Sequence, residues 1–164
     1  MSYQKLQTGR ALDVYPSDIV QIPDASTKVL AAIGDFSIAA KLSTTGQSFT
    51  TAGIVPGTSI IYNTTDGIAY GIQAIDNDNS LTVLGAVGGA AANFVIYARP
   101  TNGCVLYVGK SGDINVQMAA DKEKKFQAAD CIEFTNIPDS AFLPIQVVGV
   151  AATDTTAQNI IALW

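Results

Sequence analysis

Residues 58–74 read TSIIYNTTDGIAYGIQA, two apolar runs on either side of the polar segment NTTDG. Asp66-Gly67 between such runs is a strong short-range signal for a β-hairpin, because glycine readily adopts the positive φ of a tight turn. In the second run Ile68, Tyr70 and Ile72 alternate with small residues, as in a strand with one buried face. The stretch therefore predicts two antiparallel strands that turn at Asp66-Gly67.

The same pattern recurs along most of the chain. Glycine, proline, asparagine and aspartate separate the apolar runs, which is typical of small barrels and sandwiches. The one stretch with helix-forming composition, residues 119–129, has a single large apolar residue and so no apolar face to bury. We therefore expect an all-β fold made of small β-barrel or sandwich modules. Further strands are expected at residues 81–84, 94–97, 104–108, 114–118, 131–134, 144–150 and 159–164.

The N-terminal residues differ from the rest. Residues 1–26 show no sustained alternation, and Pro16 and Pro23 interrupt any strand ladder. We predict an extended N-terminal arm at residues 1–26, a small β-barrel-like subdomain at 27–99 and a C-terminal β subdomain at 100–164 that packs on the first. The arm either folds back on its own barrel or reaches a neighbouring subunit, and the sequence leaves both alternatives open.

Both ends of the chain carry apolar residues that need a surface to lie on. The last six residues, Asn159 to Trp164, are apolar after the asparagine and include the only tryptophan. Chain ends are usually polar and poorly ordered, so an apolar end indicates burial in the core or against a neighbour. The predicted interface residues are Tyr3, Leu6, Leu12, Val14, Tyr15, Ile19 and Trp164.

Composition and charge limit the class of partner. Only 14% of the residues are charged, against about 25% in an ordinary soluble domain, and 48% are hydrophobic. Neighbouring subunits are the simplest cover for such a surface, so we expect a homo-oligomer, a dimer or a trimer. The net charge is −5, and the only lysine cluster, within residues 121–125, alternates with acidic residues, so no nucleic-acid partner is expected. No apolar run of 18 residues is present, so no membrane partner is expected either.

The residue types needed for common catalytic chemistry are sparse. The chain contains no histidine, which excludes Ser-His-Asp and Cys-His catalysis and histidine-ligated zinc. Residues 76–80, DNDNS, resemble the start of a calcium loop, but the glycine and glutamate of that loop are replaced by Leu81 and Val87. Cys104 and Cys131 lie in apolar runs, where buried thiols are favoured over a disulfide. We expect no enzyme activity, no catalytic residue, no cofactor and no metal.

Several motifs resemble small virion structural proteins of tailed phages, notably phages of cyanobacteria and other aquatic bacteria. Near the N-terminus these are YQKL (3–6), RAL (10–12) and YPSD (15–18). Near the C-terminus they are NGCVLYVG (102–109), FLPIQV (142–147) and NIIALW (159–164), and GIVPGTSIIYN (53–63) resembles the first strand of the small barrel inserted in that family. The charged stretch at 121–125 departs from the family's glycine-rich turn.

The resemblance implies a head protein, made in the bacterial host cytoplasm, that decorates the capsid exterior. Its implied partner is the major capsid protein, whose lattice it would stabilise as a decoration (cement) protein. One alternative is a tail, spike or head–tail connector component of the virion. A second is a carbohydrate-binding adhesion module, although the chain has only one tryptophan for stacking on sugars.

Overall fold

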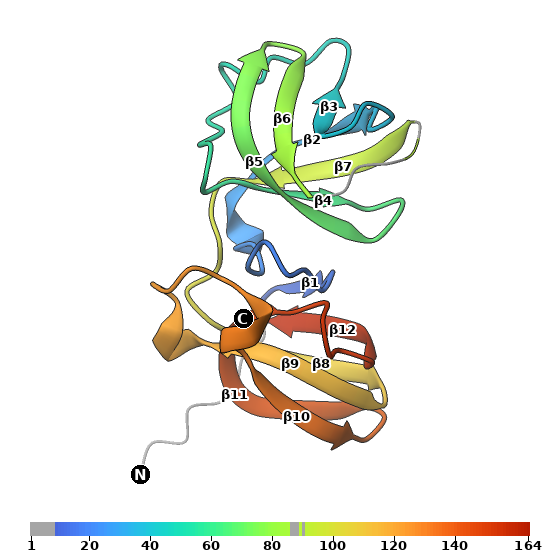
Figure 1. Cartoon of the computed structure of the whole chain (residues 1–164), viewed down its shortest axis with the longest axis vertical. Coiled ribbons are helices and arrows are strands. Elements are labelled where there is room, and N and C mark those ends of the chain that lie inside the picture. Colours follow the sequence, from blue (N-terminus) through green and yellow to red (C-terminus); the bar gives the residue numbers. More distant parts are fainter. Residues whose placement is uncertain (1–8, 86–88, 90) are drawn as a thin grey trace.

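The computed structural model describes residues 9–85, 89 and 91–164, and in them the chain folds into two β-modules, one above the other in Figure 1. Each module is built on a six-stranded antiparallel sheet. The described helical segments are three short 3-10 turns: η1 (Ala25–Thr27), η2 (Ala119–Asp121) and η3 (Ala128–Asp130). The all-β fold expected from the sequence is confirmed.

The upper module in Figure 1 is formed by the middle of the chain. Its strand order is β2-β7-β4-β5-β6-β3, and a bridge between Asp35 and Ser43 joins the two ends of this order. The sheet thereby curls around a core that contains Phe36, Phe49 and Phe94. The strands are β2 (Lys28–Gly34), β3 (Lys41–Ser43), β4 (Ile60–Asn63), β5 (Ile68–Asn77), β6 (Ser80–Leu84) and β7 (Ala92–Tyr97).

The hairpin predicted from residues 58–74 is the β4–β5 pair, and it is confirmed. Ile60 pairs with Gly71 and Asn63 pairs with Ile68, so the chain reverses across residues 64–67. Gly67 has a φ of +69°, as the turn requires. The Asn63 side chain fixes the turn, because its Oδ1 accepts hydrogen bonds from the backbone N–H groups of Thr65 and Asp66.

The lower module has the strand order β1-β12-β8-β11-β9-β10. Strand β11 is shared between two neighbours. Its first part pairs with β8 at Ala141–Leu143, its second part pairs with β9 at Val147–Val150, and the register shifts between Leu143 and Val147. The strands are β1 (Ala11–Asp13), β8 (Cys104–Lys110), β9 (Gly112–Met118), β10 (Ile132–Ile137), β11 (Ala141–Val150) and β12 (Gln158–Leu163).

The described part of the N-terminal arm lies against the chain's own C-terminal module. Strand β1 pairs with β12, with Leu12 opposite Ala162. Beyond β1, the backbone N–H of Ser17 donates to the Val150 carbonyl at 2.9 Å and that of Ile22 donates to the Val148 carbonyl at 2.8 Å. Residues 9–22 therefore fold back on their own chain, which is the first of the two alternatives left open by the sequence. Residues 1–8 lie outside the described range.

The arm also joins the two modules through an aromatic cluster. Tyr15 packs on Tyr62 of β4 with ring centroids 4.7 Å apart, and Tyr62 meets Tyr97 of β7 edge to face at 5.8 Å. Leu12 and Val20 of the arm pack against the same cluster. Burying aromatic side chains removes a large apolar area from water, so this contact helps hold the modules together.

Residues 119–130 form the two 3-10 turns η2 and η3 with a loop between them, not a helix. Their one large apolar side chain, Phe126, is buried, and its ring lies directly over the backbone of Gly149 in β11. A Cβ at position 149 would overlap that ring, so the glycine makes room for it. Cys104 and Cys131 are both free thiols, and the former is buried.

Candidate functional site

The predicted interface residues are distributed over several environments. Val14 is buried in the C-terminal core, while Leu12 and Tyr15 pack on the inter-module aromatic cluster. Trp164 packs against the C-terminal core and is partly buried. Ile19 keeps 44% of its surface exposed. Tyr3 and Leu6 lie outside the described residues, and contact of any of the seven with another subunit stays a prediction.

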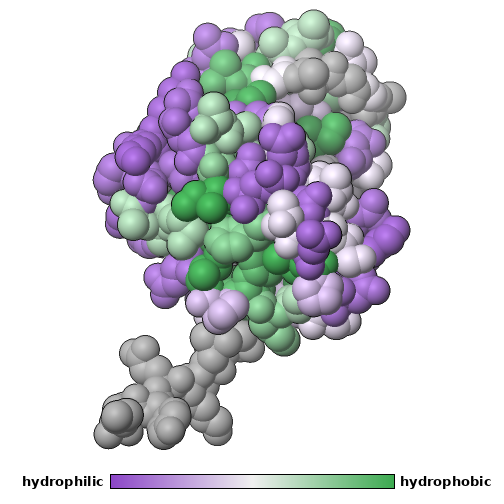
Figure 2. Space-filling view, turned by 60° about the horizontal axis from the view of Figure 1, so that its bottom comes forward, coloured by the Kyte–Doolittle hydropathy of each residue, from purple (hydrophilic) through white to green (hydrophobic). Residues whose placement is uncertain are grey.

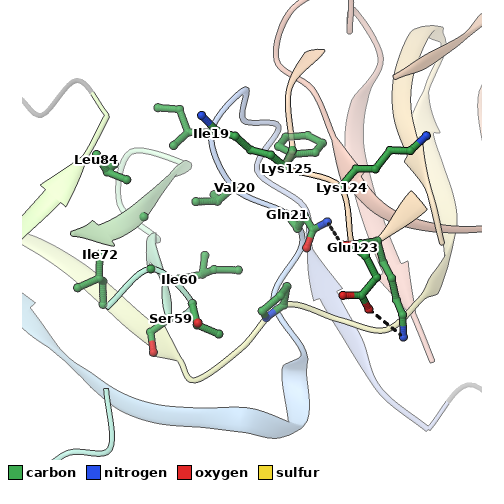
Figure 3. Close-up of a pocket in the computed structure, with 16 residues that line it drawn as sticks. Ile19, Val20, Gln21, Ser59, Ile60, Ile72, Leu84, Glu123, Lys124 and Lys125 are labelled. Atoms are coloured by element: carbon green, nitrogen blue, oxygen red, sulfur yellow. Dashed lines mark hydrogen bonds and ion pairs between the residues drawn. The ribbon is translucent and has the colours of Figure 1, made fainter. Parts of the chain in front are cut away.

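A groove of about 640 Å³ lies between the modules (Figure 3). Apolar side chains of the arm and of the barrel module form one wall, including Ile19, Val20 and Leu84. The loop at residues 122–126 forms the opposite wall and brings three lysines to it. The lining comes mainly from three stretches that are far apart in sequence, within residues 19–21, 57–84 and 122–126, so the groove was not predictable from local patterns.

Hydrogen bonds hold the lysine-bearing loop in place. Gln21 Nε2 donates to Gln117 Oε1 at 2.7 Å and to the Lys122 carbonyl at 3.2 Å. Gln117, which is buried in β9, donates to the carbonyls of Asp121 and Lys124. A buried amide group without a hydrogen-bond partner costs folding free energy. These hydrogen bonds therefore hold the loop in one position.

The positive charge of this wall is largely balanced within the loop. Lys124 forms an ion pair of 2.6 Å with Asp121, which raises the pKa of the lysine above its ordinary value. Lys122 lies 4.0 Å from the Glu123 carboxylate and donates to Asn102 Oδ1. The groove is therefore no strong anion site, which agrees with the cancelling charges in the sequence.

A second groove, of about 320 Å³, lies at the turn between β10 and β11, and only apolar residues line it. We call it the β10–β11 groove. Figure 2 brings this lower end of the molecule forward and shows hydrophobic side chains gathered there beside hydrophilic ones. Phe142 keeps 60% of its surface exposed. The lining residues are Phe134, Ile137, Pro138, Ala141, Phe142, Leu143, Pro144 and Ile145.

The backbone of β10 brings its apolar side chains to one face. Phe134 pairs with Ile114 and Ile137 pairs with Gly112, so three residues on β10 correspond to two on β9. Asn136 takes up the extra residue with a φ of +56°, a conformation that asparagine tolerates better than most residues. The bulge leaves Phe134 and Ile137 both packed towards the C-terminal core, next to the groove.

The carboxylates with displaced pKa values are engaged in turns and strand contacts. In the segment that resembles a calcium loop, Asp76 accepts from Lys41 and Thr82, and Asp78 accepts from Thr50 and Ser48. These donors lower the pKa of both carboxyls. Within residues 9–85, 89 and 91–164, no group of three or more cysteine, aspartate or glutamate side chains is placed to hold a metal ion.

Among the residues that the structure describes, the aromatic side chains offer little flat surface for sugar stacking. Tyr62, Tyr70 and Tyr97 are buried. The exposed aromatic contact is Tyr107 with Phe142, whose ring planes are inclined at 57° and so do not form a single platform.

No helix in the described part of the chain is long and apolar enough to span a membrane. No family model matches the sequence, and neither a curated protein nor a solved structure matches it.

Proposed function

We propose that this protein is a structural subunit of a virus particle, and specifically a capsid decoration protein that binds the outside of the major capsid lattice. The observation that carries the proposal is the exposed apolar surface around Phe142 at the β10–β11 groove. Apolar patches of this kind on a soluble protein mark sites where another protein binds. The resemblance to virion proteins of tailed phages is the reason for proposing a virus particle as the assembly.

The two-module body suits such a role. The inter-module aromatic cluster and the arm on β12 join the modules into one body that can bridge neighbouring capsid subunits. Exposed apolar residues on the barrel module, Ile33 at 62% and Ile38 at 58%, give further contact points on a second side. The proposal includes assembly as a dimer or trimer and a location on the capsid surface.

Copy number tests the proposal against the tail, spike or connector alternative. In purified particles we expect a fixed copy number that is close to the copy number of the major capsid protein, since a decoration protein repeats with the lattice. A few copies per particle would show a tail or connector part instead. The ratio is measured by quantitative mass spectrometry of intact particles, with the major capsid protein as internal standard.

Adding purified protein back to particles that lack it tests whether the apolar surface around Phe142 makes the contact. Purified protein is expected to rebind, and Phe142→Ser is expected to rebind more weakly because it removes the most exposed apolar side chain of the β10–β11 groove. Ile68→Ser is the matched control, since Ile68 is 41% exposed and belongs to the other module. Equal rebinding by wild type and Phe142→Ser would place the contact elsewhere.

A further inference from the structure

We propose that the groove between the modules binds an extended segment of a partner protein in which one carboxylate side chain stands between two apolar side chains. This groove shares no lining residue with the β10–β11 groove, so the proposal adds a second contact and does not depend on the virion function. It commits to a segment of a different protein, and a second copy of this chain is an outcome that the experiment can reveal.

The apolar wall of the groove is well packed from below and exposed to water above. Val20 of the arm lies against Gly71 of β5, where its Cγ1 is 3.3 Å from the position that a Cβ of Gly71 would take. Gly71 pairs with Ile60 of β4, which also lines the groove. Ile19 keeps 44% of its surface exposed and Leu84 keeps 43%, although both line the same hollow. Exposed apolar side chains that share a hollow mark a place where another protein binds.

Of the three lysines on the opposite wall, Lys125 differs from the other two. Each of the others has a carboxylate within 4.0 Å, whereas Lys125 forms no ion pair with any residue that the structure describes. In Figure 3 the Lys125 side chain is directed from the loop towards Ile19, while Lys124 points away from the groove. Glu123 is the one acidic residue in the lining, and it faces Lys122. The charge that remains in the groove is therefore a single positive one, which is complementary to a single carboxylate.

The placement of the two walls indicates the geometry of the occupant. Successive side chains of an extended segment point to opposite sides. A segment that reads apolar, acidic, apolar therefore presents its two apolar side chains to the arm and barrel wall and its carboxylate to the loop. The apolar contacts supply most of the binding free energy, because one exposed ion pair contributes little and serves selectivity instead.

The barrel strands and the open side of the groove restrict the kind of occupant further. Strand β4 lies between β7 and β5, and β5 lies between β4 and β6, so neither offers an unpaired edge for an added strand. Side chains must then supply the recognition. The groove is also open to solvent, so a small molecule would leave much of its surface in water. A protein segment is covered on that side by the body that carries it.

A peptide titration on the full-length protein tests the proposal. The probe is acetyl-Ser-Leu-Glu-Leu-Ser-amide, followed by NMR of the backbone amides, and we expect shift changes centred on residues 19–21, 57–60, 71–72 and 122–126. Replacing both leucines with serine should weaken binding at least tenfold, as expected for loss of buried apolar side chains. Replacing the glutamate with glutamine should weaken it about two- to fivefold, as expected for one exposed ion pair. Salt at about 1 M should remove that second difference by screening.

Two pairs of protein variants make the test specific. Lys125→Gln should bind the glutamate and glutamine probes equally, whereas Lys124→Gln should keep the preference for glutamate, since Lys124 pairs with Asp121. Leu84→Ser should weaken the binding of both probes. Ile68→Ser should bind as wild type does, because Ile68 is similarly exposed, at 41%, and does not line the groove. A glutamate preference that survives in Lys125→Gln, or that both lysine variants lose alike, would overturn the proposal, as would shift changes elsewhere or no binding.

Two further measurements separate the alternatives. Sedimentation of the free protein that shows a dimer broken by Leu84→Ser would identify a second copy as the occupant and overturn the proposal. If the probe binds as expected but the protein is absent from particles, the groove chemistry stands and the virion function fails. If the protein is found in particles but the probe does not bind, the virion function stands and the groove chemistry fails.

Discussion

The indole N–H of Trp164 donates a 2.8 Å hydrogen bond to the hydroxyl oxygen of Thr101, which precedes it by 63 residues. Thr101 is buried, and its own N–H donates to the Ile22 carbonyl of the arm at 2.8 Å. The Gly103 N–H donates to the same hydroxyl oxygen. One threonine between the two modules thus ties together the arm, the start of β8 and the last residue of the chain.

Trp164→Ala is expected to destabilise the isolated protein. It removes a partly buried indole and its hydrogen bond to Thr101, at a cost of about 2–4 kcal/mol. For a chain of this size that lowers the melting temperature by roughly 4–16 °C. Trp164→Phe keeps most of the apolar contact and should lose only about 1 kcal/mol. Calorimetry measures both, and a Trp164→Ala protein that melts like wild type would show that the indole serves contacts outside the monomer.

Removing the arm up to residue 20 is expected to unfold the C-terminal module. The deletion takes away β1, the buried Val14 and the Tyr15–Tyr62 contact, and leaves the edge of β12 without its partner strand. A chain that begins at Gly9 is the control, since it keeps all of these contacts. The readouts are thermal unfolding and Trp164 fluorescence. Cooperative unfolding of the shorter chain at the wild-type temperature would show that the arm is dispensable for the fold.

Local patterns predicted most of the strands but missed three. The β4–β5 hairpin and the apolar runs of β8, β9, β11 and β12 were recognisable because alternation and turn residues agreed. Strands β2 and β3 were not expected: β2 reads KVLAAIG, in which alanines and glycine weaken the strand signal, and β3 has only three residues. β1 is a strand because β12 is apolar and available as a partner, which is a tertiary effect.

The groove between the modules could not be predicted because distant segments form it. Of the arm residues singled out from the sequence, Leu12, Val14 and Tyr15 make contacts within the chain, which local patterns did not reveal. The β10–β11 groove depends on the bulge at Asn136 and the register break in β11. Its only sequence signal is the pair of prolines, Pro138 and Pro144, around Phe142, a spacing that also fits an ordinary loop.

Gly112→Ala is expected to be among the most damaging single changes in the chain. Gly112 has a φ of +154°, and a Cβ there would lie 2.5 Å from the backbone nitrogen of Ala157. Because backbone atoms cannot move aside, we expect a loss of about 3 kcal/mol or more in unfolding free energy.

Gly46→Ala is the matched control for this change. Gly46 has a φ of +76° and no atom within 4 Å of its Cβ position, so only the backbone strain of about 1 kcal/mol applies. Urea unfolding of both variants compares the two costs. Equal losses would mean that residues 156–157 do not press on Gly112 in solution.

The two thiols are expected to react very differently with an uncharged maleimide. Cys104 is 3% exposed, and burial raises its pKa to about 12. Cys131 is partly exposed; burial and then the Asp130 charge raise its pKa, so it reacts slowly but measurably as the thiolate. At pH 8 the native protein should take up one equivalent, and Cys131→Ser should take up none. The second equivalent should appear only in denaturant. Raising the pH from 8 to 9 should speed the labelling of Cys131 up to tenfold, because the thiolate fraction grows with pH below the pKa.

Cys104 makes the fold itself sensitive to alkali. Its thiol ionises near pH 8.5 when unfolded but stays protonated when folded, so stability falls as the pH rises from about 9 towards 12. Cys104→Ser should reduce that alkaline loss, while native labelling of Cys104 at pH 8 would contradict its burial.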